Sequence, residues 1–422
     1  MGRQNLFVGR AAIGALVFAG ALAAMARPHA AAGTWITAWG TSQQALAMSA
    51  VSNATVRMIA RVTIPGEAVR IRLDNTFGTT PLRIGGAYVG ERIQAAALAK
   101  GSNRHVTFKG EPTVTIAPGG TVVSDPVTIK VAAWQDLAVS LFVPDANVHP
   151  SQHTGAVVTS YLSADGSGDV TADETRMPYG RTTTAMFWLK SIDVLSSSSP
   201  GAIVAFGDSI TDGTCATLDA HDRWEDWLAV RLQLAASGRP GSGPHKAVVN
   251  EGIGGNTLTR EGLQPPPDSP PALERFDRDV LSHHGVTDVV EFIGTNDLRR
   301  GASAEQVIAA KTEIAKRVRA KGLRVVGVTI IPRHNVPPSG TNTGWDEQKT
   351  MFRNQVNQWI RTKGLFDAVL DFDKVVRDPA NADLIDPPFN CGDGIHPSPL
   401  GYYRMGLSIP LEIFARRSTR TN

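Results

Sequence analysis

The sequence predicts a chain of two parts: a β-sandwich or jelly-roll-like domain, followed by an α/β domain with a parallel sheet and helices on both of its faces. Three observations lead to this fold class. Residues 33–196 contain short alternating segments with turn residues between them. Residues 200–417 contain short apolar runs that alternate with helical patterns. A polar stretch, 196–200, separates the two, and 422 residues exceed the usual size of one domain.

The first part has the pattern of an all-β domain. Residues 69–73 alternate apolar and polar side chains, as a half-buried strand does, and residues 137–143 form a second strand-like run. Pro65-Gly66 and Pro118-Gly119-Gly120 mark turns. Short strands with turn signals between them, and no segment of helical period, favour a sandwich or a jelly roll.

The second part has the pattern of strands alternating with helices. Ser303 and Gln306 form a capping box that begins an amphipathic helix, and Gly322 follows the last turn of that helix. Because strands and helices alternate, the strands are expected to pair in parallel. The predicted strands are residues 203–206, 247–249, 289–293, 325–331 and 368–372.

Residues 1–32 resemble a signal peptide of the Sec type. Arg3 and Arg10 precede a short apolar run, and small residues offer cleavage near Ala26 or after Ala32. A membrane anchor is the alternative, but the run is short and rich in alanine. The remaining sequence has no apolar run of transmembrane length, so we expect a secreted or periplasmic protein with no stable membrane insertion after cleavage.

Composition excludes some function classes. The net charge is only +3, and the basic residues are scattered without interleaved aromatic residues, so no nucleic-acid partner is expected. The two cysteines and ten histidines show no spacing typical of a metal site. We therefore expect no metal and no cofactor; the oligomeric state does not follow from the sequence.

Two segments that follow predicted strands suggest a nucleophile and backbone donors. Gly207-Asp208-Ser209 follows the first strand of the α/β domain, where a serine on a tight turn can present its hydroxyl to a cleft. By itself this triplet is also a common turn. Residues 250–256 are glycine-rich and follow the next strand, so their N–H groups could face an oxyanion, although a flexible loop has the same composition.

Two further segments suggest an amide donor and a base. Asn296 follows the third strand, where its amide could bind an oxyanion or simply cap a helix. Asp393 precedes His396 by three residues, a spacing that lets a carboxylate fix the imidazole tautomer. The alternative is a lone surface histidine, as we expect for His283 and His284.

Together, the Gly-Asp-Ser, Gly, Gly-x-Asn-Asp and Asp-x-x-His-Pro blocks resemble those of the SGNH/GDSL hydrolases, a family of three-layer α/β/α serine esterases. The resemblance covers about half of the chain, 202–414. It implies that Ser209 is the nucleophile and that Asp393 and His396 complete a catalytic triad. It also implies an oxyanion hole made by the N–H groups of Ser209 and Gly255 and by the Asn296 amide, with Gly254 as a substitute for Gly255.

The first part of the chain resembles an exported subgroup of these hydrolases that carries an N-terminal β-domain. The resemblance lies in residues 34–39, 74–78 and 124–126. Members are commonly described as aryl or carbohydrate esterases. Trp35 and Trp39 could bind sugar rings, but core positions are the more common use of such residues.

The resemblance also bears on whether the two cysteines form a disulfide. Cys215 follows the presumed nucleophile by six residues, and Cys391 precedes Asp393 by two. If both loops border one cleft, a disulfide between them is favoured over two free thiols, and export would permit it.

Three functions fit the sequence. The first is an esterase for short acyl groups on carbohydrate or aryl esters, acting on a small-molecule or polysaccharide substrate through an acyl-enzyme. The second is a hydrolase of longer acyl esters, similar to a lipase or lysophospholipase. The third is a glycan-binding protein without activity, which the intact Ser209, Asn296, Asp393 and His396 disfavour.

Overall fold

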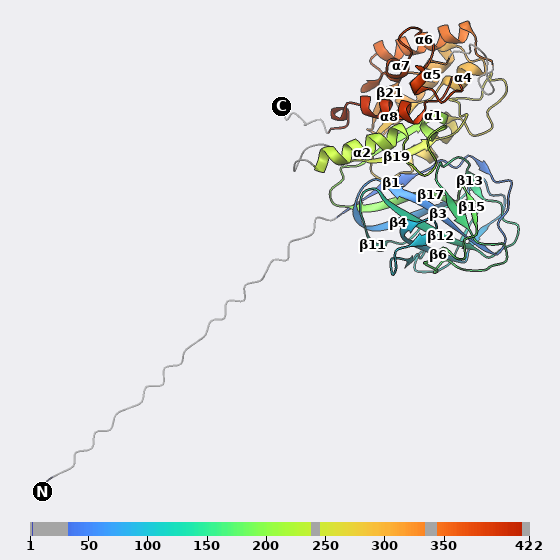
Figure 1. The fold of residues 1–422 in the computed structure, drawn as a ribbon, viewed down its shortest axis with the longest axis vertical. Helices are drawn as coiled ribbons and strands as arrows, with labels where there is room; N and C mark the ends of the chain where they lie inside the picture. The colour runs from blue at the N-terminus through green and yellow to red at the C-terminus, as the bar shows by residue number, and fades with distance from the viewer. Residues whose placement is uncertain (1, 3–32, 238–244, 334–343, 416–422) are drawn as a thin grey trace. The chain divides into compact units, whose positions relative to one another are not determined.

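The computed structural model describes residues 33–237, 245–333 and 344–415, together with Gly2 (Figure 1). Apart from Gly2, the predicted signal peptide lies outside the described residues. Residues 33–422 belong to one compact unit, so the division at 196–200 marks a change of architecture, and two separate domains remain a prediction. Within the described part of the chain, no helix has the length and apolar character needed to cross a membrane.

Residues 33–196 are rich in strands that pair antiparallel, as the alternating pattern indicates. The larger sheet has the order β15-β14-β3-β12-β6-β7, with β8 on β6, and a second has the order β1-β17-β4-β10, with β11 on β4. The strands are β1 (Thr34–Gly40), β2 (Ala45–Leu46), β3 (Ala54–Val62), β4 (Gly66–Asp74), β5 (Leu82–Ile84), β6 (Gly86–Gln94), β7 (Ala97–Leu98), β8 (Arg104–His105), β9 (Val114–Ile116), β10 (Thr121–Val123), β11 (Val127–Val131), β12 (Gln135–Val143), β13 (Ser151–His153), β14 (Ser160–Leu162), β15 (Arg181–Thr183), β16 (Met186–Phe187) and β17 (Leu189–Ser196).

From residue 202 onward, strands and helices alternate. The sheet has the order β19-β18-β20-β21-β22, and each of its four neighbouring pairs is parallel. The elements are β18 (Ala202–Gly207), α1 (Ser209–Asp212), α2 (Trp224–Ser237), β19 (Ala247–Gly252), α3 (Ala272–Phe276), the π-helix η1 (Asp277–Leu281), β20 (Val286–Phe292), α4 (Thr295–Arg299), α5 (Ala304–Ala320), β21 (Arg324–Val328), α6 (Glu347–Thr362), β22 (Ala368–Leu370), α7 (Phe372–Val376), the 3₁₀-helices η3 (Pro387–Phe389) and η4 (Leu411–Phe414), and α8 (Pro399–Ser408).

Both faces of this sheet are buried, which explains why its strands are continuously apolar. Alternate residues of β18 belong to two different hydrophobic clusters. Val204 and Phe206 pack in the cluster that contains Val307 and Ile314 of α5. Ile203 and Ala205 pack in the cluster that contains the apolar side chains of α2 and α8. The predicted capping box of α5 is present, with Ser303 and Gln306 bonded reciprocally.

The strand-rich part and the α/β part share buried contacts. Strand β1 contacts β19, and one hydrophobic cluster continues from Ile36 and Ala38 of β1 into Ala247 and Val249 of β19. The hydrophobic core is therefore continuous across the change of architecture.

Next to this shared core lies a group of buried charges, which we call the interface cluster: Lys190, Glu251, Arg275, Asp279 and His283. Lys190 of β17 donates to Glu251 at 2.9 Å and to Asp279 at 2.8 Å. His283 Nε2 lies 2.5 Å from Glu251 Oε1, so His283 is a buried partner and the expectation of a surface histidine is wrong. Arg275 donates to the carbonyl oxygen of Glu251 at 2.9 Å.

Candidate active site

The predicted nucleophile lies at the carboxyl end of β18, which pairs with β19 and β20 in the parallel sheet. Ser209 is the first residue of the short helix α1, and the Asp208 side chain caps that helix by accepting the Ile210 N–H at 3.1 Å. Gly207 is required by space, because a Cβ there would lie 2.6 Å from the Phe292 carbonyl oxygen. The strand-to-helix turn therefore holds the Ser209 hydroxyl at the edge of the sheet.

The structure brings Ser209, His396 and Asp393 together. His396 Nε2 lies 2.8 Å from Ser209 Oγ, and His396 Nδ1 lies 2.5 Å from Asp393 Oδ2. Burial acts to raise the pKa of Asp393, but the hydrogen bond and charge of His396 and two backbone N–H donors outweigh it and lower the pKa to about 2. An ionised carboxylate only accepts, so Nδ1 carries the proton of this contact, and an Nε2 that carries none accepts from the serine hydroxyl.

The residues that carry the three predicted oxyanion donors line the same cavity as this hydroxyl. Within the described residues, neither the Ser209 N–H nor the Gly255 N–H has a hydrogen-bond acceptor. The Gly254 N–H, in contrast, already donates to Asp212 Oδ2 at 2.8 Å. This contact favours Gly255 over Gly254 as the donor. Asn296 Nδ2 uses one hydrogen on the carbonyl oxygen of Asn256 at 3.0 Å and keeps the other.

These groups border one cavity of about 400 Å³. A cavity of this size can admit a small ester or one end of a larger one. It is lined by Ser209, Thr214, Gly254, Gly255, Asn296, Arg299, Arg333, Ile395 and His396.

Comparison with known families places this half of the chain. Residues 205–404 match the model of the GDSL-like Lipase/Acylhydrolase family. They form a GDSL-like lipase/acylhydrolase domain. The match contains Ser209, Gly255, Asn296, Asp393 and His396, and it begins after β17, the last strand of the preceding part.

Solved structures of this family resemble the GDSL domain at low identity. Examples are a carbohydrate acetylesterase from Sinorhizobium meliloti (18% identity, 49% of this chain and 94% of that chain covered, TM-score 0.37), a lipase/acylhydrolase from Enterococcus faecalis (23%, 49% and 92%, TM-score 0.36) and a member of the lipolytic protein G-D-S-L family from Veillonella parvula (16%, 49% and 94%, TM-score 0.33). No curated protein matches the sequence. Likenesses this low carry no argument about substrate.

Several polar residues around the site of the GDSL domain escaped the sequence analysis. Asp297 accepts the Leu258 N–H at 2.9 Å and so fixes the chain after the glycine-rich loop; burial raises its pKa to about 7. Asp212 holds Gly254, and Arg299 and Arg333 line the cavity. Two of these had a usable signal, since Asp297 belongs to the Gly-x-Asn-Asp block and Arg333 follows the end of a strand.

Arg275 belongs both to the interface cluster and to the GDSL domain, and it joins two segments of that domain near Ser209. It donates to the Gly207 carbonyl oxygen at 2.8 Å and to Asn256 Oδ1 at 3.0 Å. Asn256 in turn accepts from Asn296 through its carbonyl oxygen. One buried guanidinium therefore ties the turn before the nucleophile to the loop that carries Gly255.

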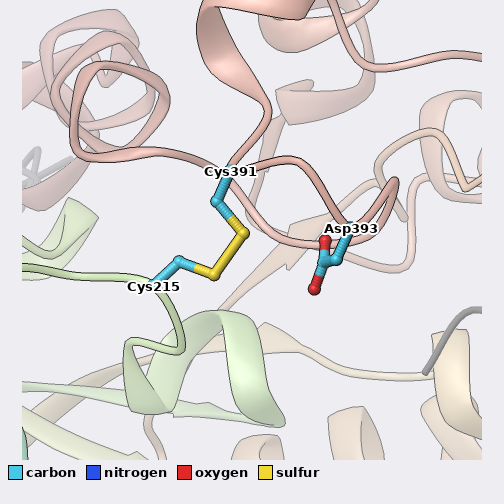
Figure 2. A group of neighbouring side chains, drawn as sticks. All are labelled: Cys215, Cys391 and Asp393. Atoms are coloured by element: carbon cyan, nitrogen blue, oxygen red, sulfur yellow. A yellow bond between two sulfur atoms is a disulfide. The ribbon is translucent and has the colours of Figure 1, made fainter. Parts of the chain in front are cut away.

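Cys215 and Cys391 form a disulfide in the structure, with their Cα atoms 6.2 Å apart (Figure 2). The bond connects the segment after α1 with the loop that carries Asp393 and His396, as the sequence analysis favoured. The two sulfur atoms and a carboxylate oxygen of Asp393 lie within 4.8 Å of one another. They make a poor metal site, because sulfur atoms in a disulfide are not thiolates and Asp393 is hydrogen-bonded to His396.

Proposed function

We propose that the chain is a secreted serine ester hydrolase that cleaves carboxylic esters through an acyl-enzyme on Ser209. One observation carries the proposal: the chain of hydrogen bonds from Asp393 through His396 to Ser209 ends at a cavity that three free hydrogen-bond donors also face. The same elements are needed by any serine hydrolase, namely an activated hydroxyl, an oriented base and an oxyanion hole.

The reaction has two steps. His396 Nε2 takes the proton of Ser209 as Oγ attacks the ester carbonyl, and the N–H groups of Ser209 and Gly255 and the Asn296 amide bind the oxyanion. The protonated imidazole then gives its proton to the leaving alcohol. Water, deprotonated by His396, attacks the acyl-enzyme in the same way and releases the acid.

For the substrate we propose short acyl groups on carbohydrate or aryl esters. Among the residues that line the cavity, Ile395 is the one large aliphatic side chain, and a single such side chain offers little apolar surface for a long acyl chain. This favours the esterase over the lipase-like alternative. The strand-rich part then serves as a wall and a brace, and we retain separate domains at 33–196 and 200–417, with three layers in the second, as part of the proposal.

Export is proposed on two grounds. Residues 1–32 have the sequence of a signal peptide, and disulfides such as Cys215–Cys391 persist in oxidising compartments. An extracellular or periplasmic substrate would be consistent with both.

The test is hydrolysis of 4-nitrophenyl esters from acetyl to dodecanoyl, together with labelling by a fluorophosphonate. We expect the highest kcat/KM with the shortest acyl groups and a single label on Ser209. Ser209→Ala should lose both, and Ser237→Ala, on the surface of α2, should lose neither. Labelling at another residue, or unchanged hydrolysis by Ser209→Ala, would refute the proposal; preference for the longest esters would replace it by the lipase-like function.

A further inference from the structure

We propose that His153, which belongs to the strand-rich part, positions the oxyanion hole through Asp212. The inference rests on the proposed function and assigns to the strand-rich part a role in turnover. His153 and Asp212 are positioning residues, because neither touches the reacting atoms.

The contact consists of one carboxylate between two partners. Asp212 is the last residue of α1, three residues after Ser209. Its Oδ2 accepts the Gly254 N–H at 2.8 Å, and its Oδ1 lies 2.9 Å from His153 Nε2. Gly254 directly precedes the proposed donor Gly255, so the carboxylate fixes the chain next to the N–H that must face the oxyanion.

His153 is itself held rigidly. It ends β13, is buried, and its Nδ1 lies 2.9 Å from the Ser42 carbonyl oxygen. A carbonyl oxygen only accepts, so Nδ1 carries a proton, and the bond to the Asp212 carboxylate requires a second proton on Nε2. These two contacts favour the protonated imidazole: burial lowers the pKa of His153, but the charge of Asp212 and the hydrogen bonds to Asp212 and Ser42 outweigh burial and raise the pKa above its ordinary value.

The glycine-rich loop needs such support. Gly255 has a φ of +70° and nothing within 4 Å of a hypothetical Cβ, so side-chain packing does not fix its conformation. An oxyanion donor acts only when it lies about 2.7–3.1 Å from the developing charge. The loop is held before Gly255 by Asp212, at Gly254, and after Gly255 by Arg275 and Asn296, which both donate to Asn256. Loss of the bond between Asp212 and the Gly254 N–H would leave the position of the neighbouring Gly255 N–H less well defined.

The variants Asp212→Ala and His153→Ala test the proposal. Loss of a whole oxyanion donor lowers turnover roughly a hundred- to a thousandfold, so displacement of one should lower kcat about 10- to 100-fold. KM should change little, because the ground-state ester does not depend on the oxyanion hole. Since the two residues act through one another, the double variant should be no slower than the slower single variant.

A matched control is Asp219→Ala. Asp219 also connects the segment after α1 to the strand-rich part, by accepting from the N–H and the hydroxyl of Thr159, but it does not contact the glycine-rich loop. Its kcat should equal that of the wild type. Full kcat in folded Asp212→Ala, equal losses in the control, or multiplicative losses in the double variant would overturn the inference. If the wild type hydrolyses esters, the proposed function stands regardless.

A different observation concerns the substrate, and from it we infer that the ester carries a negative charge near the scissile bond. Arg299 and Arg333 both line the cavity that contains Ser209. Arg299 ends α4, three residues after Asn296, and within the described residues it has no hydrogen-bond or ion-pair partner. Arg333 donates to Thr295 Oγ1 at 3.3 Å and to Asn296 Oδ1 at 3.4 Å.

The positive charges of the Arg299 and Arg333 guanidinium groups repel each other. Burial lowers the pKa of Arg333 to about 10 and the charge of Arg299 lowers it further, while the charges of Asp208 and Asp393 act in the opposite direction without restoring the ordinary value. Burial also lowers the pKa of Arg299. Two cations that share a partly desolvated cavity are stabilised by an anion, and a guanidinium matches a carboxylate or phosphate geometrically. An anionic group on the acyl or alcohol part of the ester supplies that charge.

Two pairs of esters test this second inference and distinguish its two sources. 4-Acetoxybenzoate and its methyl ester place or remove a carboxylate on the alcohol side; the 4-nitrophenyl esters of glutarate and of methyl glutarate do so on the acyl side. For the pair whose charge lies on the side that Arg299 contacts, Arg299→Gln should lower the ratio of kcat/KM for the anionic ester to kcat/KM for the neutral ester by about tenfold or more. The control, Arg404→Gln, changes an exposed arginine of α8 and should leave this ratio unchanged. An unchanged ratio in Arg299→Gln for both pairs would overturn the inference, while hydrolysis of the neutral esters reports separately on the proposed function.

Discussion

The active site and the interface cluster contain the same kinds of side chain but differ in one respect. In the interface cluster, Lys190, Glu251 and Asp279 have side chains that are at most 1% exposed, and each carboxylate is hydrogen-bonded within the group. In the active site, His396 and Asp393 are 11% and 26% exposed, and Ser209 faces a cavity. Buried, perturbed charges occur in structural networks as well as in catalytic ones. Access to a cavity separates the two.

The largest expected effect on activity, with little effect on stability, is at the proposed nucleophile. Ser209→Ala should lower kcat by at least about 10⁴-fold, because the triad acts as a unit, yet leave a small rate above that of water from the oxyanion hole. The melting temperature should be close to that of the wild type, since among the described residues the Ser209 side chain is hydrogen-bonded to His396 alone. Steady-state kinetics and calorimetry check both parts. A large loss of stability would show that the triad also supports the fold.

The interface cluster should respond in the opposite way. Lys190→Met leaves Glu251 and Asp279 buried without their common partner, and breaking such a group costs about 3–5 kcal/mol of unfolding free energy. Urea denaturation measures the loss, and Lys130→Met, exposed on β11, is the control. Below its melting temperature the folded variant should still hydrolyse esters. Stability equal to that of the control would show that the cluster contributes little.

The oxyanion hole provides a sharper comparison within the active site. Asn296→Ala removes one of three donors, and the transition state should lose about 3–4 kcal/mol, a hundred- to a thousandfold in kcat. Since Asn296 Nδ2 also holds the Asn256 carbonyl oxygen, part of the loss arises from the loop. Asn296→Asp, which keeps the shape but lacks the amide donor, should be at least as slow. Wild-type activity in either variant would remove Asn296 from the oxyanion hole.

The disulfide should give the smallest effect. Replacing Cys215 and Cys391 by serine removes a crosslink between residues 176 positions apart, and crosslinks typically contribute about 2–4 kcal/mol to stability. Thermal unfolding with and without reductant measures it. We expect kcat to fall less than in Asn296→Ala, because Asp393 remains bound to His396 and to the Ile395 N–H. A loss of activity equal to that of Ser209→Ala would mean that the disulfide positions the base.

The sequence indicated the parts of the site that lie within short blocks, and the structure brings Ser209, Asn296 and His396 together at the ends of the strands. The change from antiparallel to parallel pairing also followed from the pattern. Strand ends were less certain: β21 ends at Val328, three residues before the predicted end. Residues 329–331 are apolar or buried without belonging to a strand, so burial alone misled the prediction.

Contacts between distant positions could not be predicted. His283 was expected at the surface because nothing near it in sequence identifies Glu251 as a partner, and the same is true of His153 and Asp212. The choice between Gly254 and Gly255 also needed coordinates, since the two are equivalent in sequence and differ only in which N–H is already bonded. Pairing that depends on tertiary packing leaves no local pattern.

The position of Ser209 at the first residue of a helix has a consequence for how this site can decay. Its N–H has no partner in the helix because the first N–H groups of any helix lack one, and the Gly255 N–H is likewise a main-chain group. Two of the three proposed oxyanion donors thus survive any substitution that preserves the backbone. A single mutation can remove the proposed nucleophile, the base or the Asn296 amide. The two main-chain N–H groups, in contrast, are lost only when the backbone fold itself changes.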